Sequence, residues 1–236
     1  MATTLKTKGI VLKIKDTPGK DKLVYILTNE GLLKAFMTPK KMAGKKSFAV
    51  DLFAYGEVVY YVTDSGNNLV NSIVPDEFFF GIREDIARLY TAGYFANLAI
   101  HTQSDADTDS ETLLELVLES FKRLSNGENI KIIKPVFELV ISRLLGISPC
   151  LEAETKGREY YFSMEDGRLF INPKPNTFFV SRTVILTIYK ILNSEIQFAF
   201  DAVCEQSDML YQLCEMYIAY QTERDFEQLK FLNGVI

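Results

Sequence analysis

The sequence contains no tryptophan, one histidine (His101) and three cysteines (Cys150, Cys204 and Cys214). A single histidine excludes metal sites that need several imidazole ligands. The cysteines form no CxxC pair and are odd in number, which argues against a disulfide framework and predicts a reducing, cytoplasmic location. No apolar run approaches the roughly 18 residues that cross a bilayer, and no apolar signal segment opens the chain. We therefore expect no membrane association.

Motifs for catalysis are also missing. Residues 44–47 (GKKS) imitate the end of a phosphate-binding loop, but Pro39 stands where its first glycine belongs and a second lysine precedes the serine. The carboxylates of 105–115 lack the glycine and terminal glutamate of a calcium loop, and we interpret them as a solvated, helix-capping face. His101 is interpreted as a cation near a helix end. The sequence thus predicts that the protein is not an enzyme. A rival nuclease or other hydrolase would show metal-dependent cleavage of single-stranded DNA.

Charge is distributed unevenly along the chain. The first fifty residues hold eleven lysines and three acidic residues, a net charge of +8, whereas the whole chain carries −5. A basic segment attached to an acidic body is typical of a module with a polyanionic partner. This asymmetry is the main functional signal in the composition.

The first part of the chain predicts a small β-barrel. Five β-branched, apolar runs at residues 7–14, 22–28, 32–38, 48–63 and 68–74 predict strands, separated by turn signals at 29–31 and 64–67. Gly56 marks a kink or bulge in the long fourth run, because glycine allows the backbone to bend there. Five strands in about 75 residues, one of them bent, indicate a closed barrel of the OB type.

After residue 78 the pattern becomes helical. The spacing predicts helices at 83–100, 113–124, 135–145, 182–193 and 207–222. Thr108 and Glu111 predict a capping box for the second helix, Pro135 a helix start, and Gly146 a helix stop. A turn at 165–167 predicts a β-hairpin within about 150–180. The expected class is α+β, with an OB domain at 1–78 and a helical domain at 79–236 that carries the hairpin insert.

The lysines of the barrel predict a DNA-binding face. They lie around the first interstrand connection, on the third strand and in the loop that follows it, and the candidates are Lys13, Lys15, Lys20, Lys22, Lys34, Lys40, Lys41, Lys45 and Lys46. Ammonium groups bind phosphate as mobile point charges, so little base specificity is expected. Tyr25 and Phe36 are possible stacking platforms, although core packing is the favoured interpretation for both.

Four blocks of the sequence resemble the bacterial RecO family of recombination mediators. They read TKGIVLKIKDTPGKDKLVYILTNEGLLKAFMTPKK, KKSFAVDLFAYGEVVYYV, FFFGIREDIARLYTAGYFANLA and FELVISRLLGISPCLEAE, and they keep the order and spacing of the family over roughly residues 5–170. The resemblance implies an OB barrel, a helical body and a small zinc-binding insert. It also implies a non-enzymatic role in DNA repair: binding single- and double-stranded DNA, annealing strands, and loading RecA with RecR onto DNA coated by SSB.

The zinc ligands of the family are absent from this sequence. After Leu151, Glu154 and Gly157 stand at the first two ligand positions, and residues 168–171 (RLFI) occupy the region of the second pair. Cys150 alone cannot form a tetrahedral site of four soft ligands. We therefore expect no metal cofactor. The hairpin would instead be held by the side chains of Tyr160, Tyr161, Phe162, Phe170 and Ile171.

The resemblance also implies a pocket in the helical body for the C-terminal tail of SSB, but no local motif places it. Arg123, Lys131, Lys134 and Arg143 are loose candidates for contacts with that acidic tail. The apolar stripe of Leu210, Leu213, Tyr217 and Tyr220 is interpreted as core. The leading hypothesis is a cytoplasmic, nucleoid-associated recombination mediator. The alternative is an interaction adaptor whose OB barrel binds a protein instead of DNA.

Overall fold

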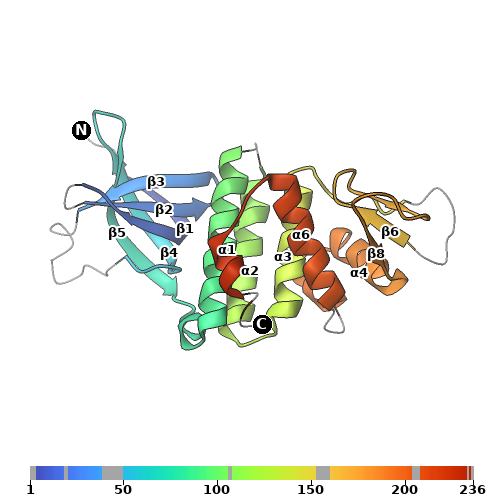
Figure 1. Ribbon diagram of the computed structural model, residues 1–236. Coiled ribbons are helices and arrows are strands. Elements are labelled where there is room, and N and C mark those ends of the chain that lie inside the picture. Colours follow the sequence, from blue (N-terminus) through green and yellow to red (C-terminus); the bar gives the residue numbers. More distant parts are fainter. Residues whose placement is uncertain are drawn as a thin grey trace. The chain divides into compact units, whose positions relative to one another are not determined.

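The computed structural model describes residues 4–18, 21–38, 50–105, 108–152, 160–203, 208–232 and 234. The chain divides into two compact units, Met1–Ser125 and Asn126–Ile236. The first unit contains a five-stranded barrel with the helices α1 and α2, and the second contains the remaining helices and a three-stranded sheet (Figure 1). The barrel strands end at Glu77 and helical residues begin at Phe80. The predicted domain boundary between residues 78 and 79 stays a prediction. None of the helices in the described ranges is both long and apolar enough to cross a bilayer.

The five strands of the first unit close into a barrel. They are β1 (Thr4–Asp16), β2 (Lys22–Thr28), β3 (Gly31–Met37), β4 (Tyr55–Val62) and β5 (Asn68–Glu77). The order around the barrel is β1-β2-β3-β5-β4, and β4 pairs back to β1. All pairs are antiparallel except β3 with β5. This arrangement confirms the predicted α+β class and the OB-like sheet.

Alternation along the strands divides the barrel side chains into those that point into the core and those that lie on the outer surface. The core contains Val24 and Ile26 of β2 and Ala35 and Met37 of β3, all buried. Because successive side chains point to opposite faces of a strand, the residues between them lie on the outer surface. The hydrophobic pattern of the sequence therefore fixes which residues remain for binding.

The run 48–63 contains the predicted fourth strand, but β4 occupies only its second half. Residues 48 and 49 lie outside the described part, residues 52–53 form a turn, and β4 begins only at Tyr55. Phe53 has a left-handed backbone with φ of 69° and its N–H donates to the carbonyl of Val11 over 2.8 Å. An apolar pattern cannot reveal such a turn. The predicted irregularity at Gly56 is confirmed by a register shift between Tyr55 and Gly56.

Helices follow the barrel with small shifts from the predicted bounds. A short 3-10 helix, η2 (Phe80–Glu84), precedes α1 (Ile86–Asp105) and α2 (Ser110–Ser125). Helix α1 packs against β1 and β3, and α2 packs against β1, β2 and β3 (Figure 1). An aromatic cluster joins α2 to the barrel end: the ring centroid of Phe121 lies 5.0 Å from that of Phe53 and 5.9 Å from that of Phe79.

The predicted capping box at Thr108 is wrong, because the cap of α2 is Asp109. The Asp109 carboxylate accepts the N–H groups of Glu111 (3.1 Å) and Thr112 (3.2 Å). Hydrogen bonds from the hydroxyl of Thr112, and from its N–H, lower the pKa of Asp109 below its ordinary value. The hydroxyl of Thr108 donates instead to the carbonyl of Thr102. A carboxylate one position later thus fills the role assigned to the threonine.

The third helix begins earlier than predicted. α3 (Ile130–Leu144) starts after Asn129, whose side chain accepts the N–H of Lys131, and Pro135 lies inside the helix rather than at its first turn. A proline inside a helix removes its own N–H from the ladder and crowds the carbonyl four residues earlier. The buried apolar face of α3 nevertheless continues on both sides of Pro135. The predicted stop at Gly146 is confirmed, since Gly146 has φ of 73° and the helix closes through paired bonds to the carbonyls of residues 142 and 143.

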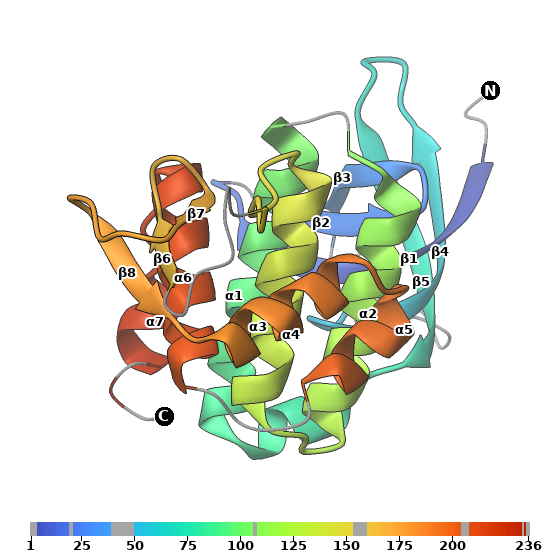
Figure 2. The ribbon, with the colours of Figure 1, turned by 90° about the vertical axis from the view of Figure 1, so that its right-hand side faces the viewer.

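In its described residues the second unit adds to α3 a small sheet and further helices (Figure 2). Its elements are β6 (Tyr160–Ser163), β7 (Arg168–Phe170), β8 (Thr177–Val180), α4 (Arg182–Leu192), α5 (Ile196–Ala199), the 3-10 helix η3 (Phe200–Ala202), α6 (Asp208–Thr222) and α7 (Glu227–Leu232). The predicted hairpin is β6 and β7, and β8 extends it to a sheet of order β7-β6-β8. The helices predicted at 182–193 and 207–222 are confirmed as α4 and α6.

The five side chains expected to stabilise the hairpin do not form one buried cluster. Phe162 is buried, with 1% of its surface exposed, whereas Tyr160, Tyr161 and Phe170 are half-buried and Ile171 is exposed. Strand alternation explains the difference, because Tyr161 and Phe170 pair with each other on the face opposite to Phe162. Of the stripe predicted on α6, Leu210, Leu213 and Tyr217 are buried and Tyr220 is exposed.

Candidate nucleic-acid interface

A cationic row crosses the outer face of the barrel. Lys13 of β1 stands opposite Tyr25 of β2, and Tyr25 stands opposite Lys34 of β3. The ammonium of Lys34 lies 5.8 Å from the centroid of the Tyr25 ring. The neighbouring residues of each strand fill the barrel core. An aromatic ring thus lies between two lysines on three adjacent strands.

A second row lies two residues further along the same face. Lys15 of β1 stands opposite Leu23 of β2, which stands opposite Phe36 of β3. Lys15 is exposed, and Tyr25 and Phe36 are half-buried on the outer surface. Our favoured interpretation of both aromatics as core was therefore wrong, because alternation along β2 and β3 directs them away from the barrel interior.

The two helices of this unit limit the outer face on one side. Leu27, next in the outward-facing series of β2, is fully buried where α2 packs on the strand. The ammonium of Lys13 donates to the side-chain carbonyl of Asn97 in α1, 3.4 Å away. Toward the other end of the strands Lys15 and Lys34 are exposed. We call the surface formed by Lys13, Lys15, Tyr25, Lys34 and Phe36 the outer lysine face.

Lys22 does not join the outer lysine face. It pairs in register with Asp16 and Met37, on the side of β2 that faces the barrel core. Its ammonium lies 3.6 Å from the carboxylate of Asp16 at the end of the barrel. A neighbouring carboxylate therefore offsets its charge. Lys20, Lys40, Lys41, Lys45 and Lys46 lie outside the described residues.

Two further lysines of β1 are matched by acids, one on the adjacent strand β4 and one on β5, the strand beyond it. Lys6 lies 3.0 Å from Glu57 of β4, and Lys8 lies 2.9 Å from Asp76 of β5. The hydrogen bond from Lys8 to Asp76 raises the pKa of Lys8 above its ordinary value. The excess positive charge of the N-terminal sequence is thus partly neutralised on this side of the barrel. No carboxylate neutralises Lys15 or Lys34 in this way, since neither lysine forms an ion pair within the described residues.

The four cations proposed for an acidic peptide are already engaged. The Arg123 side chain lies 2.7 Å from Glu119, and Lys131 lies 2.9 Å from Asp208. Arg143 donates to the carbonyls of residues 192 and 194. Lys134 is fully buried within 2.8 Å of Glu138 and of Glu215. These contacts give structural roles to all four side chains and do not mark them as a recognition site.

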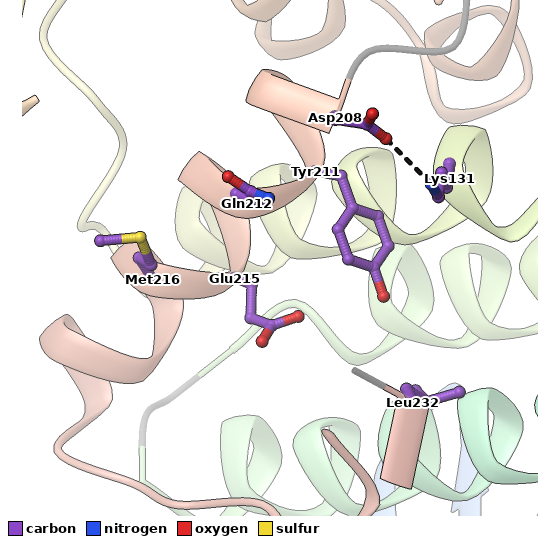
Figure 3. A pocket seen from close by; sticks show the side chains of 7 residues that line it. All are labelled: Lys131, Asp208, Tyr211, Gln212, Glu215, Met216 and Leu232. Carbon is purple, nitrogen blue, oxygen red and sulfur yellow. Dashed lines mark hydrogen bonds and ion pairs between the residues drawn. The ribbon is translucent and has the colours of Figure 1, made fainter. Parts of the chain in front are cut away.

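A pocket of about 460 Å³ lies beside α6 (Figure 3). It is lined by Lys131, Asp208, Tyr211, Gln212, Glu215, Met216 and Leu232. Burial raises the pKa of Tyr211 to about 12, so its ring stays neutral. The lining contributes two carboxylates and one ammonium, which is itself paired with Asp208. This balance does not favour an acidic ligand.

The residues of the small sheet do not fit a zinc site. Cys150 is exposed and forms a β-bridge with Arg168. Leu169 is buried, and neither it nor Phe170 offers a metal ligand. Glu154 and Gly157 lie outside the described residues. Across the part of the chain that is described, no three His, Cys, Asp or Glu side chains gather in a metal-binding arrangement. His101 lies in α1, four residues before its last residue.

Comparison with known proteins identifies the family. The family model described as "Recombination protein O C terminal" matches residues 83–230. This range begins within η2, contains α1 to α6 and ends within α7, and the chain belongs to this family. The resemblance seen in the four sequence blocks is therefore confirmed.

Curated relatives carry the same family name. "DNA repair protein RecO" of Bacillus velezensis is 26% identical over 169 residues, covering 68% of this chain and 65% of the relative. The protein of the same name from Bacillus subtilis is 26% identical over 170 residues with the same coverage. That of Lactococcus lactis subsp. cremoris is 28% identical over 145 residues, covering 61% of this chain and 57% of the relative. The chain thus matches somewhat less than two thirds of the length of these relatives.

Proposed function

We propose that this protein is a non-enzymatic, DNA-binding mediator of recombinational repair. It would bind single- and double-stranded DNA, anneal complementary strands in the cytoplasm at the nucleoid, and act with RecR to help load the recombinase onto SSB-coated DNA. Support comes from its membership of the recombination protein O family and from relatives named as DNA repair proteins. The observation that carries the proposal on this chain is the outer lysine face.

The mechanism would depend on charge neutralisation. Lys13, Lys15 and Lys34 present ammonium groups to phosphates, and displaced counterions supply free energy for binding. Tyr25 and Phe36, on the same face, offer rings on which bases stack without regard to sequence. OB folds use the surface of strands 2 and 3 for oligonucleotides. Two strands whose phosphates are screened repel each other less, which would ease annealing.

The outer lysine face can be tested by salt-dependent binding. We propose titrating a labelled single-stranded oligonucleotide by fluorescence anisotropy at several salt concentrations. Lys15→Ala/Lys34→Ala should weaken binding to all sequences alike and should flatten the log–log salt slope by roughly 0.7 for each phosphate that is no longer neutralised. The matched control is Lys6→Ala/Lys8→Ala, which removes the same charge from the ion-paired side of the same barrel. Equal effects of the two double variants would refute a localised face.

The basic segment that holds Lys40, Lys41, Lys45 and Lys46 remains part of the proposal, although it lies outside the described residues. Replacing these four lysines by alanine should also weaken binding and flatten the slope, because ammonium groups bind phosphate as point charges. Unchanged binding by this quadruple variant would remove the loop from the interface. The same titration in the presence of the SSB tail peptide would test that partner.

A protein-binding adaptor is the alternative function. An aromatic pair supports it: the rings of Phe78 and Phe80 stack with centroids 5.0 Å apart just after β5, and Phe80 is 59% exposed whereas Phe78 is half-buried. Exposed apolar groups of this kind are typical of protein interfaces. Absence of oligonucleotide binding even at low salt, together with capture of a purified protein partner, would favour the adaptor.

We further propose that the zinc of the family insert has been lost. The donor set supports this, because Arg168, Leu169 and Phe170 occupy the region expected for the second cysteine pair. Elemental analysis of the purified protein should find less than one zinc per chain, and one zinc per chain would overturn the proposal.

A further inference from the structure

The small sheet of the second unit has one face packed on helix α6. Phe162 of β6 and Leu169 of β7 are buried, and the ring of Phe162 meets that of Tyr217 edge-on with centroids 5.2 Å apart. The amide of Gln221 donates to the carbonyl of Met164 over 2.6 Å. These contacts hold the sheet to α6, which lies beside it in Figure 2. The sheet is therefore a supported platform and not a free hairpin.

The opposite face carries an aromatic residue on each of its three strands. Tyr161 of β6 stands opposite Phe170 of β7 and also opposite Phe179 of β8. The rings of Tyr161 and Phe179 lie 6.1 Å apart between centroids and meet edge-on. Phe179 is 49% exposed, and Tyr161 and Phe170 are half-buried. We call Phe170, Tyr161 and Phe179 the aromatic row.

Positive charge accompanies the aromatic row. The ammonium of Lys174 lies 3.6 Å from the centroid of the Phe170 ring. Arg168 is exposed and lies two residues before Phe170 in the same strand, so it shares the face of the row. Rings on the surface of a sheet with cations at the edge form the arrangement that binds unpaired bases and their phosphates.

We propose that the aromatic row is a second binding site for single-stranded DNA, separate from the outer lysine face. Bases stack on Tyr161 and Phe179, and Lys174 and Arg168 contact the flanking phosphates. Stacking uses the faces of the bases, which every base has, so this site does not select a sequence. Glu165 and Asp166 belong to the turn between β6 and β7, whereas Arg168 lies on the face of the aromatic row and Lys174 lies against Phe170, so the charge on this face favours a polyanion.

The absence of tryptophan from the sequence allows a direct test. Phe179→Trp introduces a single indole into the aromatic row. Titration of the full-length variant with oligo(dT) should quench its fluorescence saturably, because a stacked base contacts the indole. The matched control is Tyr189→Trp, which places an indole at a 57% exposed position on α4. Its emission should change little.

A loss-of-function pair completes the experiment. Tyr161→Leu/Phe179→Leu should weaken oligo(dT) binding by tenfold or more, and Tyr189→Leu should leave it unchanged. Circular dichroism and urea unfolding would establish that the double variant is folded. If it is unfolded, the Trp quenching decides alone. Unquenched Phe179→Trp in a protein that binds DNA would overturn the aromatic site and leave the outer lysine face standing. If the Phe179→Trp indole is still quenched when Lys15→Ala/Lys34→Ala is added, the two sites are separate. If the unmodified protein binds no DNA, both proposals fail.

Discussion

Lys134→Met should be among the most destabilising single substitutions in the second unit. The ammonium of Lys134 lies 2.8 Å from Glu138 and 2.8 Å from Glu215, and the side chains of Lys134 and Glu138 are both 0% exposed. The ring of Tyr211 lies 4.2 Å from the same ammonium. Methionine fills most of the space of the lysine stem but leaves a buried carboxylate without its cation. Breaking a buried ion pair in this way costs roughly 3–5 kcal/mol, a large share of the ~5–15 kcal/mol that stabilises a typical domain.

The dependence of this loss on pH has a defined sign. Burial opposes the charge of Lys134, but the carboxylates of Glu138 and Glu215 outweigh it and raise its pKa above the ordinary 10.5. Its contribution is therefore fully present below pH 10.5 and is lost only as the pH rises through the higher folded pKa. In Lys134→Met the stranded Glu138 should bind a proton more readily when folded than when unfolded. The deficit should accordingly shrink as the pH is lowered from about 8 to about 5.

Urea unfolding of three variants separates the buried charge from other effects. Lys131→Met, one turn earlier on α3, removes a lysine whose partner Asp208 is 69% exposed, and should cost at most about 1 kcal/mol. Lys134→Met/Glu138→Leu should recover much of the single variant's loss, because no stranded carboxylate remains on that helix. The reasoning is refuted if Lys134→Met is no more harmful than Lys131→Met, or if the double variant is as unstable as Lys134→Met alone.

Three further predictions concern stability and reactivity. Asp109→Ala should lower the free energy of unfolding by about 1 kcal/mol because it removes the cap of α2, and Asp109→Asn should retain most of that stability; equal losses in thermal unfolding would contradict the capping role. Gly56→Ala would place a methyl group in steric overlap with the carbonyl oxygen of Val74 in β5, so we expect a loss of about 3 kcal/mol in urea unfolding, and a wild-type midpoint would contradict the close approach. In a Cys204→Ser variant, exposed Cys150 should react rapidly with a thiol reagent. Buried Cys214 should react only on unfolding, because burial raises its pKa well above the ordinary value. Equal reaction rates of the two thiols would contradict this prediction.

The sequence predicted those features that depend on local chemistry. The range 22–28 matches β2 in both bounds, because its β-branched and apolar residues are flanked by turn signals. Gly56 and Gly146 were identified from their freedom to bend the chain, and both lie at an irregularity or a helix end. Signals of this kind are complete within a few residues, so no knowledge of the tertiary structure is needed to read them.

The features that the sequence missed depend on partners distant in the chain. Phe53 and Phe79 adopt left-handed backbones although neither is glycine, and both pack on Phe121 of α2. In the sequence, nothing distinguishes Lys6 from the other ten lysines of the basic segment. Its ion pair with Glu57 depends on the pairing of β1 with β4. Tyr25 was assigned to the core because periodicity gives two faces of a strand but not which one is buried.

Strand register therefore decides which charges of the basic segment are available. It pairs Lys6, Lys8 and Lys22 with carboxylates and aligns Lys13 and Lys34 on either side of Tyr25. A binding surface needs cations whose charge is not already matched, since a paired ammonium must give up a carboxylate before it neutralises a phosphate. The same reasoning applies to the sheet of the second unit, where alternation leaves an aromatic row opposite its buried face. If the protein anneals DNA strands as we propose, the cationic face of one unit and the stacking face of the other would provide a separate contact for each strand.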